Sequence, residues 1–305
     1  MSTFQKATRK QIKIKIGVTG PTGSGKTFGS LRLAKGLAAG GKIAFIDTEN
    51  ESASLYSGSV NDHEGRAHAF DFDVINIAPP FTHDKFINAI EAAVKEQYQV
   101  VVIDSGSHFW EGILDRKSKL DAQGGNSFSN WAKVTDDYKD ILAAVLQSPI
   151  HVICCLRSKM DYILEEVERN GRKTSVPKKV GLAPVMRDGV EYEFTTVFDV
   201  ALDHNAACSK DRTSLFTGKI AQLTEDTGAA ILSWLSTGAP VNRPSTRAAP
   251  LITADAKGRA IAAKDRLKNL DAAAAGVARD LWTKFDGKWA EMAEAMEAAL
   301  AERES

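Results

Sequence analysis

A glycine-rich run near the amino terminus has the residue types and spacing that bind phosphate groups. Gly20-Pro21-Thr22-Gly23-Ser24-Gly25-Lys26-Thr27 fits the pattern G-x-x-x-x-G-K-[ST] at every fixed position. The glycines allow the backbone to curl so that successive N–H groups converge on a phosphate. The Lys26 ammonium would face the β- and γ-phosphates, and the Thr27 hydroxyl would ligate Mg²⁺. The run therefore predicts a binding site for a nucleoside triphosphate, built from all eight of its residues.

A second candidate for nucleotide chemistry is a carboxylate at the end of a strongly apolar run. Residues 100–103 are Val-Val-Val-Ile, and Asp104 follows them directly. Such a run is typical of a central strand that is buried on both faces. We expect this strand to lie next to the strand that enters the glycine-rich run, so that Asp104 reaches the Mg²⁺ ion through a water molecule. Ser105 would either polarise water or cap the end of the strand.

Hydrolysis also requires a base that orients the attacking water. Glu49 is the best candidate because it follows the apolar run that ends in Phe45-Ile46-Asp47, a position that would bring its carboxylate toward the γ-phosphate. Asp47 is the main alternative, and Glu51 is a weaker one. Each of these carboxylates is alternatively a solvated loop charge.

The alternation of apolar runs along the chain predicts the scaffold that positions these residues. A β-rich segment, 12–18, enters the glycine-rich run, and a helical pattern from Lys26 to about Ala39 follows it. Thr82 is a predicted helix cap. Further strands are predicted at 42–47, 72–78, 100–104 and 150–156, and further helices directly after Thr82 and around 131–145. Strands that alternate with helices predict an α/β fold with a mostly parallel sheet.

The pattern changes in the second half of the chain. Residues 162–180 predict an exposed β-hairpin with Asn170-Gly171 at its turn, and strand-like runs resume at 192–202 and 213–217. Prolines then mark a linker, and an alanine-rich helical region follows it. We therefore predict a core (1–235), a Pro-containing linker (236–251) and a helical C-terminal region (252–305).

An apolar stripe runs along the predicted C-terminal helices. Its members fall on one helical face and are Leu281, Phe285, Trp289, Met292, Met296 and Leu300. We expect this stripe to dock on the core or on a neighbouring subunit.

The composition predicts a cytoplasmic protein. With 305 residues the chain can hold one α/β core and an appendage. The formal net charge is zero, so no global field attracts nucleic acid or a membrane. No signal peptide precedes the first strand, and no apolar run approaches the length of a membrane span. Cys154, Cys155 and Cys208 lack metal-binding spacing and are expected to be reduced thiols, the first two buried.

Several of these segments, in this order, resemble bacterial RecA. Residues 45–50, Phe-Ile-Asp-Thr-Glu-Asn, are similar to the RecA segment that carries the catalytic glutamate. Tyr56 stands seven residues after Glu49, where RecA has a tyrosine that stacks on adenine. Ile103-Asp104-Ser105 resembles the magnesium strand of RecA. The run Ser209-Lys210-Asp211-Arg212-Thr213 resembles its pair of cations that reach the γ-phosphate of the neighbouring subunit.

The resemblance covers roughly residues 12–220 and implies a RecA-like P-loop NTPase core with a β-hairpin extension and a helical C-terminal appendage. It implies that the chain binds ATP and Mg²⁺, that Glu49 is catalytic and that Tyr56 stacks on the adenine. It also implies a homo-oligomer, a filament or a ring, in which Lys210 and Arg212 act on the nucleotide of a neighbour.

Residues 186–194 and 209–213 further resemble a narrower group, the phage-encoded RecA-like ATPases of the AAA family. Members of that group are implicated in single-strand annealing beside a single-strand-binding protein, which implies a phage protein in a bacterial host. The chain departs from RecA in having only a short basic lead in place of the N-terminal oligomerisation helix. Residues 150–156 also lack the glutamine that RecA uses there as a nucleotide sensor, so Arg157 or Lys159 would have to substitute for it.

In the RecA architecture, two loops line the filament axis, and the matching segments here are 112–127 and 158–187. The first suits a mobile loop that contacts a nucleic-acid backbone. The tip of the second, from Arg169 to Lys179, has five cations and no acid, which favours phosphate contacts, although a solvated hairpin is the plain alternative. The DNA-binding candidates are Lys117, Lys119, Arg169, Arg172, Lys173, Lys178 and Lys179.

Three functions agree with these observations. The first is a Mg²⁺-dependent ATPase that binds single-stranded DNA and promotes strand annealing or exchange. The second is an ATP-switched scaffold that hydrolyses slowly and recruits or loads other replication proteins. The third is a P-loop kinase for a small molecule, in which the predicted hairpin would be a lid. Stimulation of turnover by DNA or by a metabolite distinguishes the first from the third.

Overall fold

The computed structural model describes residues 10–62, 64–124, 126–169 and 172–239 and, in the C-terminal region, 260, 263–264, 267, 272–285 and 289–304. For residues 160–181 only the backbone is described. Within these ranges, no helix is long and apolar enough to cross a membrane.

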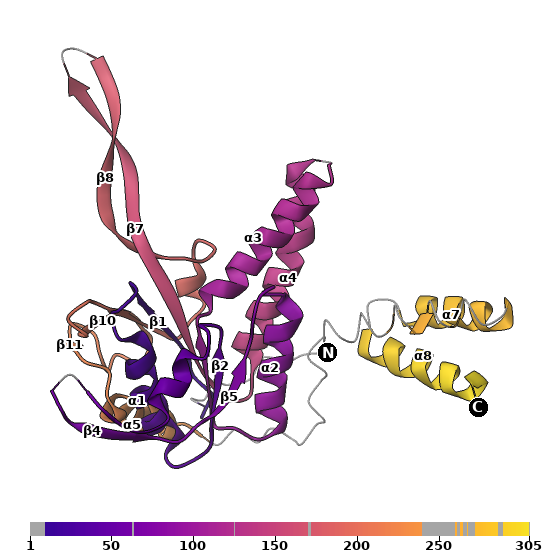
Figure 1. Cartoon of the computed structure of the whole chain (residues 1–305), viewed down its shortest axis with the longest axis horizontal. Coiled ribbons are helices and arrows are strands. Elements are labelled where there is room, and N and C mark those ends of the chain that lie inside the picture. Colours follow the sequence, from indigo (N-terminus) through magenta and orange to yellow (C-terminus); the bar gives the residue numbers. More distant parts are fainter. Residues whose placement is uncertain are drawn as a thin grey trace.

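A nine-stranded sheet forms the centre of the core (Figure 1). Its strands are, in spatial order, β11 (Ile220–Ala221), β10 (Ala206–Asp211), β9 (Thr196–Val200), β1 (Lys15–Gly20), β7 (His151–Arg169), β6 (Val100–Asp104), β2 (Ile43–Asp47) and β5 (Asp73–Asn76), with β8 (Arg172–Pro184) paired to β7 outside this path. All neighbours from β9 to β5 are parallel, and β10 and β11 are antiparallel additions at one edge. The predicted α/β fold with a mostly parallel sheet is confirmed.

Helices cover both faces of the sheet. On one face lie α1 (Lys26–Ala38) and α5 (Glu225–Ser236). On the other lie α2 (His83–Lys95), α3 (Ser107–Ala122) and α4 (Ser127–Gln147). Both faces of the central strands are therefore buried, which explains why their sequences are continuously apolar.

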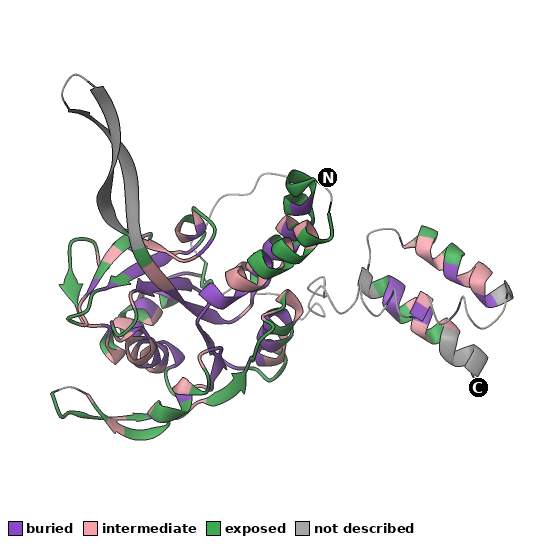
Figure 2. Cartoon of the chain, turned by 45° about the horizontal axis from the view of Figure 1, so that its top comes forward, coloured by how far each residue is buried: buried purple, intermediate pink, exposed green. Residues whose placement is uncertain are grey.

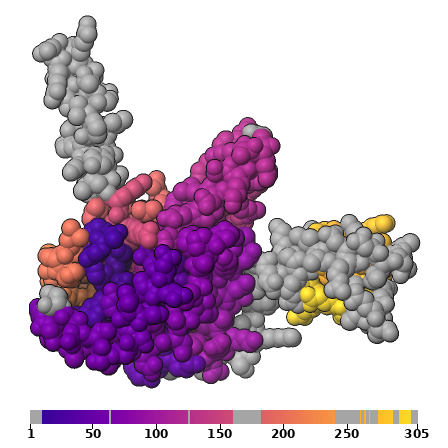
Figure 3. All heavy atoms as spheres, viewed as in Figure 1, coloured from indigo at the N-terminus to yellow at the C-terminus, as the bar shows by residue number. Residues whose placement is uncertain are grey.

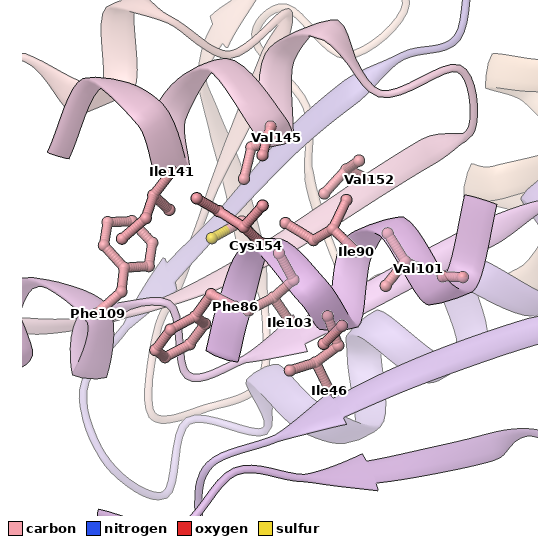
Figure 4. Close-up of a cluster of buried hydrophobic side chains, with 14 of the residues drawn as sticks. Ile46, Phe86, Ile90, Val101, Ile103, Phe109, Ile141, Val145, Val152 and Cys154 are labelled. Carbon is pink, nitrogen blue, oxygen red and sulfur yellow. The ribbon is translucent and has the colours of Figure 1, made fainter. Parts of the chain in front are cut away.

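Side chains of each central strand alternate between the two apolar layers. Val101 packs in the layer of α2, α3 and α4, whereas Val102 packs in the layer of α1 and α5. Cys154 and Cys155 divide in the same way, and both are buried as predicted. Figure 4 shows Val101 and Cys154 among the side chains of the first layer, and the sheet is the buried centre in Figure 2. This alternation follows from the period of two in a strand.

The strand order corrects one prediction. β6, which ends in Asp104, does not lie next to β1, because β7 pairs with both of them in parallel. The apolar run at the start of β7 is buried on both faces, and this run therefore takes the central place. Asp104 nevertheless meets the phosphate loop, because α1, which begins at the end of this loop, contacts both β7 and β6.

A second correction concerns residues 112–127, which were expected to be a mobile loop. Most of them belong to α3, which begins at Ser107 and ends at Ala122. Phe109 and Ile113 are buried one turn apart, and this apolar face holds the helix against α2 and α4. The far ends of α3 and α4 project from the core as an arm (Figure 3).

The two strand-like runs after the hairpin were predicted only in part. Residues 192–202 contain β9, but Tyr192 belongs to a 3-10 turn (Val190–Tyr192). The predicted strand at 213–217 is wrong: β10 ends at Asp211, whose carboxylate accepts hydrogen bonds from the backbone N–H groups of Thr213 and Phe216. This local side-chain capping replaces strand pairing with a turn.

The predicted hairpin is present as a long two-stranded ribbon of β7 and β8. The pairs run from Ser158↔Pro184 to Arg169↔Arg172, and the ribbon extends well beyond the sheet (Figure 1). The predicted turn residues 170–171 lie outside the described residues. A second, unpredicted hairpin of β3 (Gly58–Asn61) and β4 (Ala67–Phe70) follows a 3-10 helix, η1 (Ser52–Tyr56).

In the C-terminal region, α7 (Ala272–Lys284) and α8 (Trp289–Glu304) confirm the predicted helices. Met292 and Met296 are buried in a cluster with Ala274 and Ala278. Among the side chains that the structure describes, the apolar stripe therefore packs within this region and not on the core. Docking on a neighbouring subunit, the other predicted alternative, stays a prediction. The side chains of Trp289 and Leu300 lie outside the described residues, and the division of the chain at residues 235 and 251 stays a prediction.

Candidate nucleotide site

The glycine-rich run forms a loop between β1 and α1. Gly23 has φ 82° and Gly25 has φ 86°, and this left-handed conformation is accessible to glycine at little cost. Gly20 is also required, since a Cβ atom there would lie 2.5 Å from the carbonyl oxygen of Val200. The loop ends at the first turn of α1, where free backbone N–H groups and the helix dipole favour an anion.

Lys26 lies inside this loop. Its ammonium donates hydrogen bonds to the carbonyl oxygens of Gly20 and Pro21, each over 2.9 Å. The residue is 8% exposed. The charge is thus held over the loop, where it can meet the phosphates of a nucleotide.

Thr27 and Asp104 come together from α1 and β6. The Thr27 hydroxyl donates to Oδ2 of Asp104 over 2.6 Å. Burial raises the pKa of Asp104 to about 6, although the hydrogen bond from Thr27 opposes this shift. The two side chains supply the hard oxygen ligands that Mg²⁺ prefers.

A magnesium ion at this pair would need further ligands. Among the described residues no group of three or more His, Cys, Asp or Glu side chains could hold a metal. The donor set therefore fits an ion that is shared with the phosphates of a nucleotide, the common arrangement for Mg²⁺ in nucleotide sites.

A cavity of about 350 Å³ adjoins the loop. Lys26, Thr27, Phe28 and Tyr56 line it together. Tyr56 is half-buried beside Phe28, with 6.0 Å between the ring centroids. The structure thus brings the predicted adenine-stacking tyrosine into the same cavity as the phosphate loop.

The three candidate carboxylates have different surroundings. Asp47 is 2% exposed, and its oxygens accept hydrogen bonds from the N–H groups of Glu49 (2.6 Å) and Ala53 (2.8 Å). It therefore holds the backbone of η1 in place. Glu51 is exposed and precedes η1 with φ 63°. Glu49 is left as the carboxylate best able to act on a water molecule.

Glu49 is bound by an arginine at the base of the ribbon. Arg157 donates from Nε to Oε1 of Glu49 over 3.0 Å, and one of its terminal nitrogens lies 3.9 Å from Glu111. The backbone of Arg157 is held on both sides, by the Ser107 hydroxyl (2.9 Å) and by the N–H of Val185 (2.6 Å). Arg157 therefore joins Glu49 to the point where β7 leaves the sheet.

Sequence reasoning missed several polar residues of the site. His108 is buried, stacks on Phe81 and is 2.6 Å from the Thr48 hydroxyl through Nδ1. Burial lowers the pKa of His108, and the Arg157 charge adds to this effect. His204 contacts the loop itself, with Nδ1 3.0 Å from the carbonyl oxygen of Ser24. No motif marks either histidine, because their partners are distant in sequence.

Lys210 and Arg212 lie away from this cavity. Asp211, between them, pairs with Thr196, which pairs with Ile16 near the start of β1, whereas the phosphate loop follows the end of β1. The Lys210 ammonium donates to the carbonyl oxygens of Glu191 (3.3 Å) and Tyr192. Burial and the neighbouring Arg212 lower the pKa of Lys210. Arg212 is exposed.

The predicted DNA-binding cations divide into two groups. Lys117 is engaged within α3 and α4, with its ammonium bound to Asp121 and to the Ser127 hydroxyl (2.8 Å), whereas Lys119 is exposed. The ribbon cations lie on β7 and β8, but their side chains lie outside the described residues; they are Arg169, Arg172, Lys173, Lys178 and Lys179.

The family to which the chain belongs follows from one of three comparisons with known proteins. No curated protein sequence matches the chain. Among solved structures, one match is the genome packaging NTPase of Sulfolobus turreted icosahedral virus 2 in complex with sulfate, at 14% identity and a TM-score of 0.34, covering 61% of this chain and 74% of that one. A family model described as AAA domain matches residues 12–229. The chain therefore belongs to the AAA-domain family of P-loop proteins and is an NTPase.

Proposed function

We propose that the chain is a Mg²⁺-dependent ATPase that acts on single-stranded DNA in recombination of the phage type. One observation carries this proposal: Arg157 binds Glu49 over 3.0 Å at the residue where β7 leaves the sheet and enters the ribbon. A ligand that displaces the ribbon would thereby move the arginine that holds the hydrolytic carboxylate.

The residues of the cavity have distinct roles in this proposal. Lys26 binds the β- and γ-phosphates, and Tyr56 stacks on the adenine. Thr27 and Asp104 hold Mg²⁺, which when bound neutralises charge on the phosphates. Glu49 orients the attacking water once it is released from Arg157.

Single-stranded DNA would bind along the ribbon. The register places Arg169 opposite Arg172 and Lys173 opposite Glu168 at its outer end, so most charge at the tip is positive. Such a tip suits a nucleic-acid backbone, whose phosphates dominate affinity. Subunits of a filament or ring would place Lys210 and Arg212 beside a neighbour's nucleotide, and a single-strand-binding protein is a further proposed partner.

The decisive experiment measures ATP turnover by the full chain alone, with single-stranded DNA and with duplex DNA. We expect turnover to rise only with single-stranded DNA. Turnover that no DNA changes, at protein concentrations that bind DNA, would contradict the proposal.

A second function, an ATP-switched scaffold, is favoured by the hydrogen bonds that already engage Lys26 and Glu49. Lys26 is bound to two loop carbonyls and Glu49 to Arg157, an arrangement that suits tight binding and slow turnover. Tight ATP binding with turnover that stays low under every DNA condition would favour the scaffold.

A further inference from the structure

The cavity beside the phosphate loop continues along α1. Gly25, Phe28, Gly29 and Arg32 line it, and their spacing of three and four residues places them on one face of the helix. Arg32 lies about 9 Å along the helix axis from Lys26, at a rise of about 1.5 Å per residue. This far half of the cavity therefore lies where the nucleoside of a bound nucleotide would extend.

Arg32 is a cation with few partners. One of its terminal nitrogens donates to Oε1 of Gln222 over 3.3 Å, and its guanidinium lies 5.8 Å from the centre of the Phe28 ring. Its Nε is buried without a hydrogen-bond partner among the described residues. The second terminal nitrogen of Arg32 makes no hydrogen bond among the described residues. Because Arg32 lines the cavity, its guanidinium therefore keeps a donor for an acceptor that the chain itself does not provide.

The carboxylate that lines the cavity does not supply that acceptor. Asp62 lines the same cavity, but it already accepts hydrogen bonds from Nε of Arg66 (2.9 Å), from His68 (3.0 Å) and from two backbone N–H groups of its own hairpin. Burial, and then the neighbouring Arg66 charge, lower the pKa of Arg32. The charges of Asp62, Glu225 and Asp226 act in the opposite direction, but none of these carboxylates forms an ion pair with Arg32 among the described residues.

Gln222 gives the same wall a second donor. Its amide oxygen is occupied by Arg32, so its NH₂ group is the part that can contact a ligand in the cavity. Both side chains thus present N–H groups. A wall of donors selects acceptor atoms, such as a ring nitrogen or carbonyl of a base, or a ribose oxygen.

We infer that Arg32, oriented by Gln222, is a specificity-determining residue that donates a hydrogen bond to an acceptor atom of the nucleoside. This inference rests on the proposed function, because it requires a nucleoside triphosphate at the loop. It assigns recognition of the phosphates and recognition of the nucleoside to different parts of α1.

Calorimetric titration of the full chain with three probes in the presence of Mg²⁺ tests this assignment: ATP, ribose 5-triphosphate and inorganic tripolyphosphate. We expect Arg32→Met to raise the Kd of ATP about tenfold or more, as for a lost hydrogen bond to a charged group. The Kd of tripolyphosphate should change by less than about twofold. Lys35→Met is the matched control, since Lys35 is a partly exposed cation of α1 in an ion pair with Glu225 (2.9 Å).

The three probes separate the possible acceptors. A Kd of ribose 5-triphosphate that is unchanged by Arg32→Met identifies an acceptor on the base, and a raised one identifies a ribose oxygen. If Arg32→Met raises the Kd of ATP and the Kd of tripolyphosphate by the same factor, the inference is wrong. It is also wrong if Arg32→Met leaves the Kd of ATP unchanged. Gln222→Ala, which leaves α1 intact, should weaken ATP binding about threefold without affecting tripolyphosphate. A parent chain that binds no ATP would instead refute the proposed function.

Discussion

Glu49 and Asp47 lie two residues apart, but their surroundings give them different roles. The Asp47 carboxylate accepts hydrogen bonds from two backbone N–H groups, whereas the Glu49 carboxylate is paired with an arginine side chain. Glu49→Gln should leave ATP affinity intact and lower turnover about 10²-fold or more, as for a lost base. Asp47→Asn is the comparison variant, and it should lower the thermal stability of the protein more than its ATP turnover. If Asp47→Asn alone stops turnover in a stable protein, the assignment is wrong.

The pKa of Asp104, raised to about 6 by burial, predicts a pH dependence of metal binding. The folded protein binds this proton more tightly than the unfolded chain does, so the contribution of Asp104 to stability falls as the pH rises from about 4 to about 6. Mg²⁺ needs the deprotonated carboxylate. Affinity for Mg²⁺ in the ATP complex should therefore fall up to about tenfold from pH 7 to pH 5.

Asp104→Asn is the control for this prediction, because an amide does not titrate in this range. The variant should bind Mg²⁺ weakly at both pH values. A parent protein whose Mg²⁺ affinity stays constant from pH 7 to pH 5 would show that another group holds the metal.

At the scale of elements, the junction of β7 with the ribbon links the two proposed sites. Arg157→Ala removes the partner of Glu49, so the ratio of ATP turnover with and without single-stranded DNA should fall toward one. Partly exposed ion pairs contribute about 1 kcal/mol or less, so basal turnover without DNA should rise, by no more than about fivefold. Lys159→Ala, a nearby exposed cation, should retain the full ratio. The opposite result would transfer the coupling role to Lys159.

The ribbon itself can be tested through the salt dependence of DNA binding. Replacing Arg172, Lys173, Lys178 and Lys179 with alanine should weaken binding and lower the slope of log affinity against log salt by about 0.7 for each lost phosphate contact. Lys139 and Lys219, two exposed cations elsewhere, provide a control pair. An unchanged slope would mean that the ribbon tip is only solvated.

The sequence predicted those elements whose signals are local. The phosphate loop, α1 and β6 each carry a pattern within a few residues, and the structure has them where the patterns indicated. Helix α3 was missed because the resemblance to RecA assigned residues 112–127 to a loop that lines the filament axis. Gly112, in the centre of α3, is needed for close packing, since a Cβ there would lie 1.7 Å from the carbonyl oxygen of Phe81.

Contacts between distant segments could not be predicted. The insertion of β7 between β1 and β6 depends on which strands pair across long loops, and neighbouring apolar runs carry no mark of their partner. For the same reason the pairs Arg157–Glu49 and Arg32–Gln222 were not foreseen, since 108 and 190 residues separate their members. The residues of the phosphate loop could be predicted from the sequence, whereas the hydrogen bonds between side chains from distant segments could not.

At the scale of the whole molecule, the location of Arg212 predicts an assembly. The residue is exposed at the opposite end of β1 from the phosphate loop, so it cannot serve its own nucleotide. Arg212→Ala should keep ATP affinity and lower turnover about 10³-fold or more at every protein concentration. Mixing it with Lys26→Ala, which should not bind ATP, should restore part of the activity. Turnover by a strict monomer, or a fully active Arg212→Ala, would rule out action between subunits.

The place of β7 between β1 and β6 also has a consequence for synthesis on the ribosome. A nascent chain that ends before residue 150 already contains the phosphate loop and Asp104, yet it lacks the strand that joins their two strands. In this chain β1 could pair directly with β6. Such mispairing would occupy the strand edges of β1 and β6 with which β7 pairs in the folded protein. Nucleotide cannot protect this early chain, because Thr27 and Asp104 meet only after β7 has entered the sheet. We therefore expect a chain that ends before residue 150 to be prone to mispairing and aggregation until β7 has emerged.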